Sequence, residues 1–231
     1  YGLKTTVIGN PAMGRTEKGD GAAFRAAHGI ATDAQVLLVL PGSRPSEVKR
    51  VAPVLMEAAK LLKTELPDLA VLVSPAASVA EAFDAAFPGA GAWTIRPDGE
   101  EGRLNAMAAA DLALACSGTV TTELAVQGTP MIGGYKTGWI TWAIARGFLY
   151  QKTHITLLNI ASDDTEIVPE LVQTAFTPAT IAERAGDLLI VPDRLAALKA
   201  AQDAALLRMG RMEASSADLS AEAILADLDA L

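Results

Sequence analysis

The sequence predicts an α/β fold, with a parallel sheet of about six strands, helices on both faces and further helices at the C-terminus. Three observations lead to this prediction. Short apolar runs alternate with helical segments over most of the chain. The run at 35–40 is apolar on both faces, as expected of a strand covered by helices on both sides. Composition agrees, because 51% hydrophobic and 20% charged residues suit a folded domain and exclude a disordered chain.

The expected elements can be taken in order. A polar loop and a short helix come first, and His28 caps that helix before the stop residue Gly29. The next helix begins near Pro45 with apolar residues at i, i+3, i+4 and i+7 spacing, and Pro53 should kink or split it. From Thr177 onward the chain is helical and rich in alanine. Strands are expected at 35–40, 69–73, 92–95, 112–116, 130–134 and 155–160, and the helices between them at 77–87, 102–110 and 119–126.

These patterns divide the chain into three parts. We expect residues 1–34 to be a lead-in and interdomain linker, 35–190 to be the main domain, and 191–231 to be a C-terminal helical extension. The chain starts at Tyr1 without an initiator methionine, and residues 5–9 already have the pattern of a strand. We therefore expect it to be a piece of a longer protein.

Charge and composition exclude several classes of function. A net charge of −8 and a pI near 4.8 argue against non-specific nucleic-acid binding, which needs clustered cations. The single cysteine, Cys116, lies in an apolar run and is expected to be a buried thiol rather than a nucleophile. His28 and His154 are too few and too far apart to indicate a metal centre. No apolar run approaches the ~20 residues that span a bilayer, so we expect a soluble, cytoplasmic protein that at most lies on a membrane.

The turn after the strand at 112–116 is the main candidate for an anion site. Ser117, Gly118 and Thr119 are small, and a helix follows them directly and ends at Gly128. Such a turn leaves backbone N–H groups and the positive end of the helix dipole exposed, which favours phosphate. Glu123 lies about one turn further on. It is either a carboxylate that suits the first turn of a helix, which the residues alone favour, or an acceptor for the hydroxyls of a ribose beside a diphosphate.

Two other stretches carry candidate binding residues. Gly42, Ser43 and Arg44 follow the strand at 35–40, where open α/β sheets bind ligands, and the Arg44 guanidinium is suited either to a phosphate or to solvent. The segment 136–152 combines tryptophans with three basic residues and no acid. It suits a membrane interface or an acyl-chain pocket, and equally a buried crossover helix. Its candidate contact residues are Trp139, Trp142, Arg146 and Phe148. Asn159, near the end of the last expected strand, is a turn residue or a site group.

With these residues in view, the chain resembles the C-terminal half of the lipid-A-disaccharide synthase family, glycosyltransferases of the GT-B type. The likeness covers Val7 to about Leu189, including the spacing between motifs. The motifs are specific in combination, whereas any one alone is weak. They are VIGNP at 7–11, LPGSRPSEVKR at 40–50, ACSGTVTTELAVQGTPMIGGYK at 115–136, the aromatic segment 139–150, and ITLLNIA followed by EIVPELVQ.

The resemblance implies a fold and an activity. Residues 35–190 would be a Rossmann-like domain that binds a UDP-sugar donor. The family joins UDP-2,3-diacylglucosamine to an acylated sugar 1-phosphate acceptor through a β-1,6 linkage, inverting the anomeric centre without a metal. Neither a cofactor nor a nucleic-acid partner is implied, and a homodimer is left open. Carried over, Gly42, Ser43 and Arg44 would lie at the diphosphate, Ser117, Gly118 and Thr119 at the helix mouth, Glu123 at the ribose, and Asn159 would match a family asparagine.

The sequence also departs from the family pattern. Leu158 stands where the family has proline, Asn10 where it has histidine, and Asp164-Thr165-Glu166 where Gly-Arg-Glu is expected one residue earlier. No catalytic residue is assigned in this chain, because the family base lies in the N-terminal domain. Alternatives remain: another GT-B glycosyltransferase, a UDP-sugar epimerase of the same fold, or a non-catalytic module that binds nucleotide sugars. A dehydrogenase is disfavoured, because no GxGxxG follows a strand.

Overall fold

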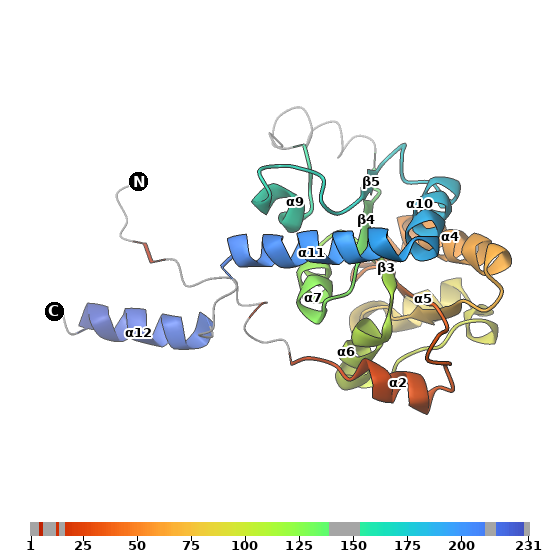
Figure 1. Ribbon diagram of the computed structural model, residues 1–231, viewed down its shortest axis with the longest axis horizontal. Helices are drawn as coiled ribbons and strands as arrows, with labels where there is room; N and C mark the ends of the chain where they lie inside the picture. Colours follow the sequence, from red (N-terminus) through yellow and green to blue (C-terminus); the bar gives the residue numbers. More distant parts are fainter. Residues whose placement is uncertain (1–4, 7–12, 14–16, 139–152, 211–215, 229–231) are drawn as a thin grey trace.

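A computed structural model, which describes residues 5–6, 13, 17–138, 153–210 and 216–228, has the predicted α/β architecture (Figure 1). One parallel sheet has the strand order β2-β1-β3-β4-β5. All four strand pairs are parallel, so the connections between them are crossovers, many of them helical. The strands are β1 (Val36–Leu40), β2 (Ala70–Val73), β3 (Leu112–Cys116), β4 (Met131–Tyr135) and β5 (Glu170–Val172).

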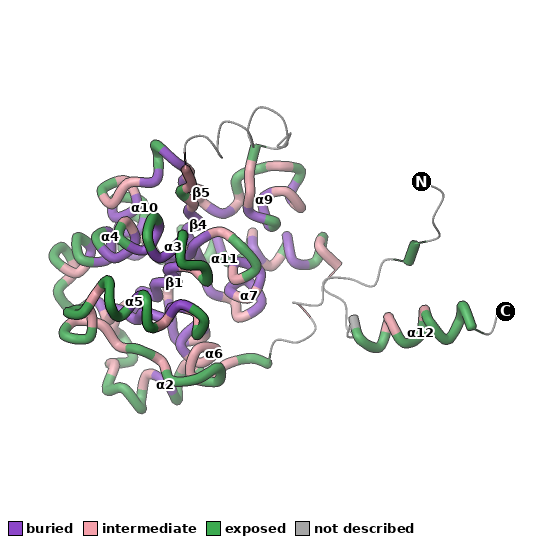
Figure 2. The backbone as a smooth tube through the Cα atoms, turned by 180° about the vertical axis from the view of Figure 1, so that it is seen from behind, coloured by how far each residue is buried: buried purple, intermediate pink, exposed green. Residues whose placement is uncertain are grey.

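Helices cover the sheet on both faces, as the apolar pattern of the strands predicted. Successive residues of β1 belong to different halves of the core: Leu37 and Val39 to one, Val36, Leu38 and Leu40 to the other. Figure 2 shows the strands as the buried centre of the fold, with exposed residues on the outer sides of the helices. A strand buried on both faces needs no polar alternation, which explains its continuous apolar run.

The helices divide between the two faces. On the first lie α3 (Pro45–Arg50), α4 (Ala52–Glu65), α5 (Ala80–Ala86) and α10 (Pro178–Ile190). On the second lie α2 (Gly21–Ala27), α6 (Gly99–Ala109), α7 (Thr119–Gln127), α9 (Leu157–Ala161) and α11 (Pro192–Arg208). Two 3₁₀ turns, at Ala77–Val79 and Ala90–Ala92, and α12 (Ser216–Leu228) complete the described elements.

Several local predictions are confirmed. The helix containing Pro53 is split, with α3 ending at Arg50 and α4 starting at Ala52. His28 is the C-cap of α2, and its Nδ1 lies 2.9 Å from the carbonyl oxygen of Phe24. Gly128 ends α7 with φ 79°, the left-handed conformation that favours glycine. Cys116 is buried.

The prediction of a strand at 155–160 is wrong, since this stretch contains the short helix α9. The carboxylate of Glu170 accepts hydrogen bonds from the backbone N–H groups of Ile155 and Thr156, both at 2.8 Å, so a sheet partner is not needed there. Leu158 and Asn159 are buried while Leu157 is exposed, which is a helical rather than an alternating pattern. The last strand of the sheet is instead β5, which pairs with Gly133–Tyr135 of β4.

The expected strand at 92–95 is also reduced. Only Ile95 pairs with the sheet, through an isolated parallel bridge to Leu72. Ala90–Ala92 form a 3₁₀ turn, so too few residues remain for a full strand. The described sheet therefore has five strands rather than about six.

Both ends of the described main domain carry packed helices. In α2, Phe24 is buried against the core. In α11, the side chain of Gln202 accepts a hydrogen bond from the N–H of Met131 and donates one to the carbonyl of Thr129. These helices therefore contribute to the domain, although the first was assigned to a linker and the second to an extension. Among the described helices, none has the length and apolar character needed to cross a membrane.

Candidate functional site

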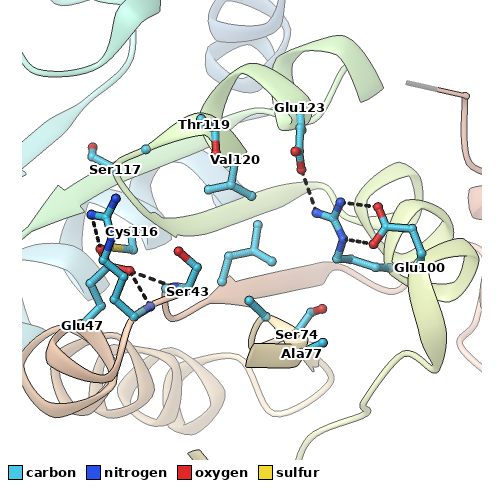
Figure 3. A pocket seen from close by; sticks show the side chains of 16 residues that line it. Ser43, Glu47, Ser74, Ala77, Glu100, Cys116, Ser117, Thr119, Val120 and Glu123 are labelled. Carbon is cyan, nitrogen blue, oxygen red and sulfur yellow. Dashed lines mark hydrogen bonds and ion pairs between the residues drawn. The ribbon is translucent and has the colours of Figure 1, made fainter. Parts of the chain in front are cut away.

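A pocket of about 470 Å³ opens at the carboxyl ends of β1 and β3 (Figure 3). These strands are neighbours in the sheet, but the chain leaves β1 for β2 on one side and returns to β3 on the other. The loops after β1 and β3 therefore diverge, and open α/β sheets bind ligands at such a switch point. Seven of the eight residues assigned to the donor line this pocket: Gly42, Ser43, Arg44, Ser117, Gly118, Thr119 and Glu123.

The first wall is the turn after β1, which is organised by a carboxylate. Glu47 is buried and accepts hydrogen bonds from the backbone N–H groups of Ser43 at 2.8 Å and Arg44 at 3.2 Å. It also receives the Arg44 guanidinium at 3.3 Å, although the Arg44 side chain stays 71% exposed. At Gly42, φ is 121°, and a Cβ there would lie 2.6 Å from atoms of Glu47. Only glycine therefore allows the carboxylate to approach the turn this closely.

The second wall is the turn after β3. Gly118 is the N-cap of α7 and has no side chain to cap the helix. The Thr121 hydroxyl bonds back to the Gly118 carbonyl at 2.7 Å rather than to a first-turn N–H. Thr119 and Val120 at the start of α7 line the pocket, and α7 has no side-chain cap. The uncapped N–H groups and the helix dipole together favour an anion at this end of the helix.

At the far end of the pocket, Glu123 is held by an arginine (Figure 3). The Arg103 guanidinium, from α6, donates to Oε2 of Glu123 at 2.7 Å. Its other nitrogens form a bidentate pair with Glu100 at 2.9 and 2.6 Å. Hydrogen bonding to Glu100 and then to Glu123 raises the pKa of Arg103, so the guanidinium is firmly charged. Hydrogen bonding to Arg103 lowers the pKa of Glu100.

Ser117 is tied to the neighbouring strand and to α9. Its hydroxyl lies 3.3 Å from the hydroxyl of Thr156. A Cβ on Gly133 would lie 3.1 Å from the Ser117 hydroxyl oxygen and 3.3 Å from that of Thr156. Glycine at this position therefore leaves room for both hydroxyls. Because Glu170 fixes the backbone of Thr156, it also fixes the position of this hydroxyl next to the pocket.

Asn159 is the one predicted donor-binding residue that lies outside the pocket. It is fully buried, and its amide nitrogen donates to the carbonyl of Val168 at 2.9 Å. Its amide oxygen accepts from the N–H groups of Ile167 at 3.0 Å and Val168 at 2.8 Å. The side chain therefore anchors the segment before β5 to α9. Trp139, Trp142, Arg146 and Phe148, the predicted membrane or acyl-chain contacts, lie outside the described residues.

Two departures from the expected family pattern have a structural role. Leu158 is fully buried in the second half of the core. Asp164 has φ 58° and accepts hydrogen bonds from the N–H groups of Thr153 and His154, which lower the pKa of its carboxyl. Asp164 thus closes the loop in which the sequence comparison led us to expect Gly-Arg-Glu. Within the described part of the chain, no group of three or more His, Cys, Asp or Glu side chains could hold a metal ion.

The sequence missed Glu47 and Arg103 as site residues. A signal existed for Glu47, since it stands three residues after Arg44 at the start of a helix, where a glutamate can accept from the N-cap N–H. No such signal exists for Arg103. It is 20 residues from Glu123 in sequence, on a different helix, and only the packing of α6 against α7 brings the two together.

The model of the lipid-A-disaccharide synthetase family matches residues 1–225. The chain belongs to the lipid-A-disaccharide synthase family. It is 37% identical to the lipid-A-disaccharide synthase of Paramagnetospirillum magneticum over 226 residues and 39% identical to that of Ruegeria pomeroyi over 239. Each match covers 97% of this chain and 57% of the relative, so the chain spans little more than half the length of these relatives.

Solved structures outside the synthase family share the fold. The UDP-GlcNAc 2-epimerase of Neisseria meningitidis, bound to UDP-GlcNAc, superposes with a TM-score of 0.57 at 14% identity, covering 88% of this chain and 48% of that one. WaaG, a glycosyltransferase involved in lipopolysaccharide biosynthesis, gives a TM-score of 0.51 at 21% identity, covering 80% and 46%. The predicted GT-B-type architecture is thereby confirmed for this synthase-family chain.

Proposed function

We propose that this chain binds the UDP-sugar donor of an inverting glycosyltransferase, which joins UDP-2,3-diacylglucosamine to 2,3-diacylglucosamine 1-phosphate in the β-1,6-linked disaccharide of lipid A. One observation carries the proposal. The switch-point pocket combines an uncapped helix N-terminus, at Gly118 and Thr119, with an anchored carboxylate, Glu123, one turn deeper. The first suits a diphosphate and the second a ribose diol, and their order along α7 is the order of these groups in a nucleoside diphosphate.

The diphosphate contacts need one revision. Gly42, Ser43 and Arg44 were assigned to it together, but Glu47 already occupies the backbone N–H groups of Ser43 and Arg44. We therefore assign the phosphate contacts on this side to the Arg44 guanidinium and the Ser43 hydroxyl, with Gly42 shaping the turn. On the opposite side, the N–H groups at the start of α7 complete the contacts, and Ser117 supports that turn through Thr156.

The chemistry follows from this arrangement. Transfer of the sugar leaves negative charge on the departing UDP, and a cation is most effective where that charge grows. We propose Arg44 for this role, because it is a cation in the lining of the pocket. The three carboxylates that line the pocket, Glu47, Glu100 and Glu123, each pair with groups of the protein. We therefore propose that the base that activates the acceptor hydroxyl comes from outside this chain.

Binding of UDP to the 231-residue chain tests the proposal. Calorimetry should detect UDP binding, and Glu123→Ala should weaken it at least tenfold, because a charge-assisted hydrogen bond is worth about 1.5–3 kcal/mol. The same change should alter pyrophosphate binding much less. Glu57→Ala, on the exposed surface of α4, is the matched control and should bind UDP like the parent. Equal UDP affinity in the parent and Glu123→Ala would reject the ribose assignment.

Turnover distinguishes the enzyme from a binding module. The chain alone should not transfer sugar from UDP-2,3-diacylglucosamine at saturating donor and acceptor. Joined to the N-terminal portion of a relative, it should form the disaccharide. UDP binding without turnover in the joined protein would favour the non-catalytic module, and epimerised UDP-sugar would favour the epimerase.

We also propose contact with a membrane, because both substrates carry acyl chains. The aromatic and basic residues Trp139, Trp142, Arg146 and Phe148 are the candidate contacts from sequence. Co-sedimentation with anionic vesicles should fall in the Trp139→Ser, Trp142→Ser double variant and at high salt. Equal sedimentation of parent and variant would contradict this assignment.

A further inference from the structure

Arg103 occupies an unusual position among the residues of the pocket. It comes from α6, yet its guanidinium reaches the carboxylate of Glu123 on α7. The Arg103 and Glu123 side chains are 21% and 27% exposed, whereas Glu100 is 71% exposed. Glu100 thus holds the guanidinium from the more exposed side, through two hydrogen bonds, while a third hydrogen bond joins the guanidinium to Glu123 in the pocket lining.

The two carboxylate oxygens of Glu123 differ in their hydrogen bonding. Oε2 accepts from Arg103, while Oε1 forms no hydrogen bond to any residue in the described part of the chain. A carboxylate that a charged guanidinium holds through one oxygen has fewer orientations open to it, which narrows the range of directions of the other oxygen. Glu100, Arg103 and Glu123 all line the pocket. An ion pair between helices that served only to stabilise the fold would not need to lie there.

We propose that Arg103 is a positioning residue that makes the pocket selective for ribonucleotides over 2′-deoxyribonucleotides. It holds Oε2 of Glu123 and thereby presents Oε1 to the ribose hydroxyls. A site built to hydrogen-bond a hydroxyl rejects the analogue without it, since Oε1 of the partly buried Glu123 then loses its partner in the complex. The inference rests on the proposed function, because it requires the ribose to lie at Glu123.

The test compares two ligands that carry the same charge. The dissociation constants of UDP and 2′-deoxy-UDP are measured by calorimetry for the parent and for Arg103→Met, which keeps a long side chain but removes every donor. Loss of the Arg103 charge weakens both ligands alike through long-range electrostatics, and this common effect cancels in the ratio of the two constants. The ratio therefore reports the hydroxyl contact alone.

We expect the parent to prefer UDP at least tenfold and Arg103→Met to prefer it less than threefold. Arg103→Lys keeps the charge but not the planar fork, so its ratio should lie between these values. Arg96→Met is the matched control, since Arg96 pairs with Asp84 away from this pocket, and its ratio should equal that of the parent. If Arg103→Met does not fold, Arg103→Lys and Glu100→Gln carry the test, both with a reduced ratio.

The outcomes separate this inference from the proposed function. A folded Arg103→Met with the parent's ratio would overturn the positioning role while leaving UDP binding intact. A parent that binds UDP and 2′-deoxy-UDP equally would overturn the ribose selectivity. A parent that binds pyrophosphate but gains nothing from the nucleoside would reject the proposed function itself, and the inference with it.

Discussion

The carboxylate of Glu47 accepts a hydrogen bond from the backbone N–H of Ser43 at 2.8 Å inside the pocket. A negatively charged side chain thus occupies an N–H group that a phosphate would otherwise use. Because Glu47 also receives the N–H and the guanidinium of Arg44, it fixes both the turn and the cation beside it. The pocket proposed to bind an anion therefore contains a carboxylate of the protein that organises one of its walls.

We expect Glu47→Ala to weaken UDP binding about tenfold, or ~1.4 kcal/mol, because Ser43 and Arg44 lose the acceptor that orders the turn. Glu47→Gln keeps an acceptor oxygen and should lose less. Calorimetry at a temperature where both variants are folded measures the effect. Tighter binding by either variant would show that Glu47 competes with phosphate for the turn and that its repulsion outweighs its ordering role.

Asn159→Ala should destabilise the protein without changing its affinity for UDP. The variant leaves the buried N–H of Val168 without an acceptor and removes one of the two acceptors of the Ile167 N–H, the other being the carbonyl of Thr165. We expect this loss to lower the free energy of unfolding by about 2 kcal/mol. UDP affinity should stay within twofold of the parent, because Asn159 does not line the pocket.

Urea unfolding and calorimetry together check this prediction. Asn105→Ala removes a comparable side-chain acceptor, for the N–H of Asp20, but at an exposed site, and should cost clearly less. If Asn159→Ala is as stable as the parent but binds UDP poorly, Asn159 contributes to donor binding and this prediction is wrong.

Gly134→Ala should be strongly destabilising. A Cβ at this position would lie 2.1 Å from the ring of Phe176, which is 1% exposed and cannot move aside. Overpacking of this kind costs about 2–3 kcal/mol. Gly91→Ala is the control, because a Cβ there meets nothing within 4 Å. Chemical denaturation measures both variants, and equal stability of the two would show that the core around Phe176 is loosely packed.

The Cys116 thiol should make stability depend on alkaline pH. Burial, followed by the nearby Glu47 carboxylate, raises the pKa of Cys116 to about 12. The raised pKa means that the folded chain keeps the proton that the unfolded chain releases near pH 8.5. The stabilisation that comes from the raised pKa of Cys116 is fully present below about pH 8.5. As the pH rises from there towards 12, the free energy of unfolding falls by up to about 1.4 kcal/mol per pH unit.

Denaturant unfolding of the parent and Cys116→Ala between pH 8 and 10 checks this dependence. Other alkaline groups titrate in both proteins, so the difference between the two curves reports the thiol together with its coupling to Tyr135. Parallel curves would show that Cys116 does not titrate as its burial implies. Thiol reagents should also react slowly with the native parent at pH 8.

The sequence alone was sufficient for the fold class and for most of the pocket. Apolar runs that alternate with helical segments predict a covered parallel sheet, and β1, β2, β3 and β4 lie where these runs are. Ser117-Gly118-Thr119 and Gly42-Ser43-Arg44 can be identified from the sequence as candidate binding turns, because small residues between a strand and a helix are typical of such turns. Strand order then places both turns at one switch point, an arrangement that local patterns do not specify.

Tertiary contacts decided what local patterns could not. Residues 155–160 are apolar enough for a strand, but the carboxylate of Glu170 accepts from the N–H groups of Ile155 and Thr156, and α9 begins directly after them at Leu157. Asn159 has a motif position that suggests a ligand, yet its amide is used entirely within the core. Arg103 has no motif at all, and it reaches Glu123 only because α6 packs against α7. The periodicity of apolar residues indicates which side chains are buried. The pairing of charged groups from different helices and strands depends on distances that only the folded chain defines.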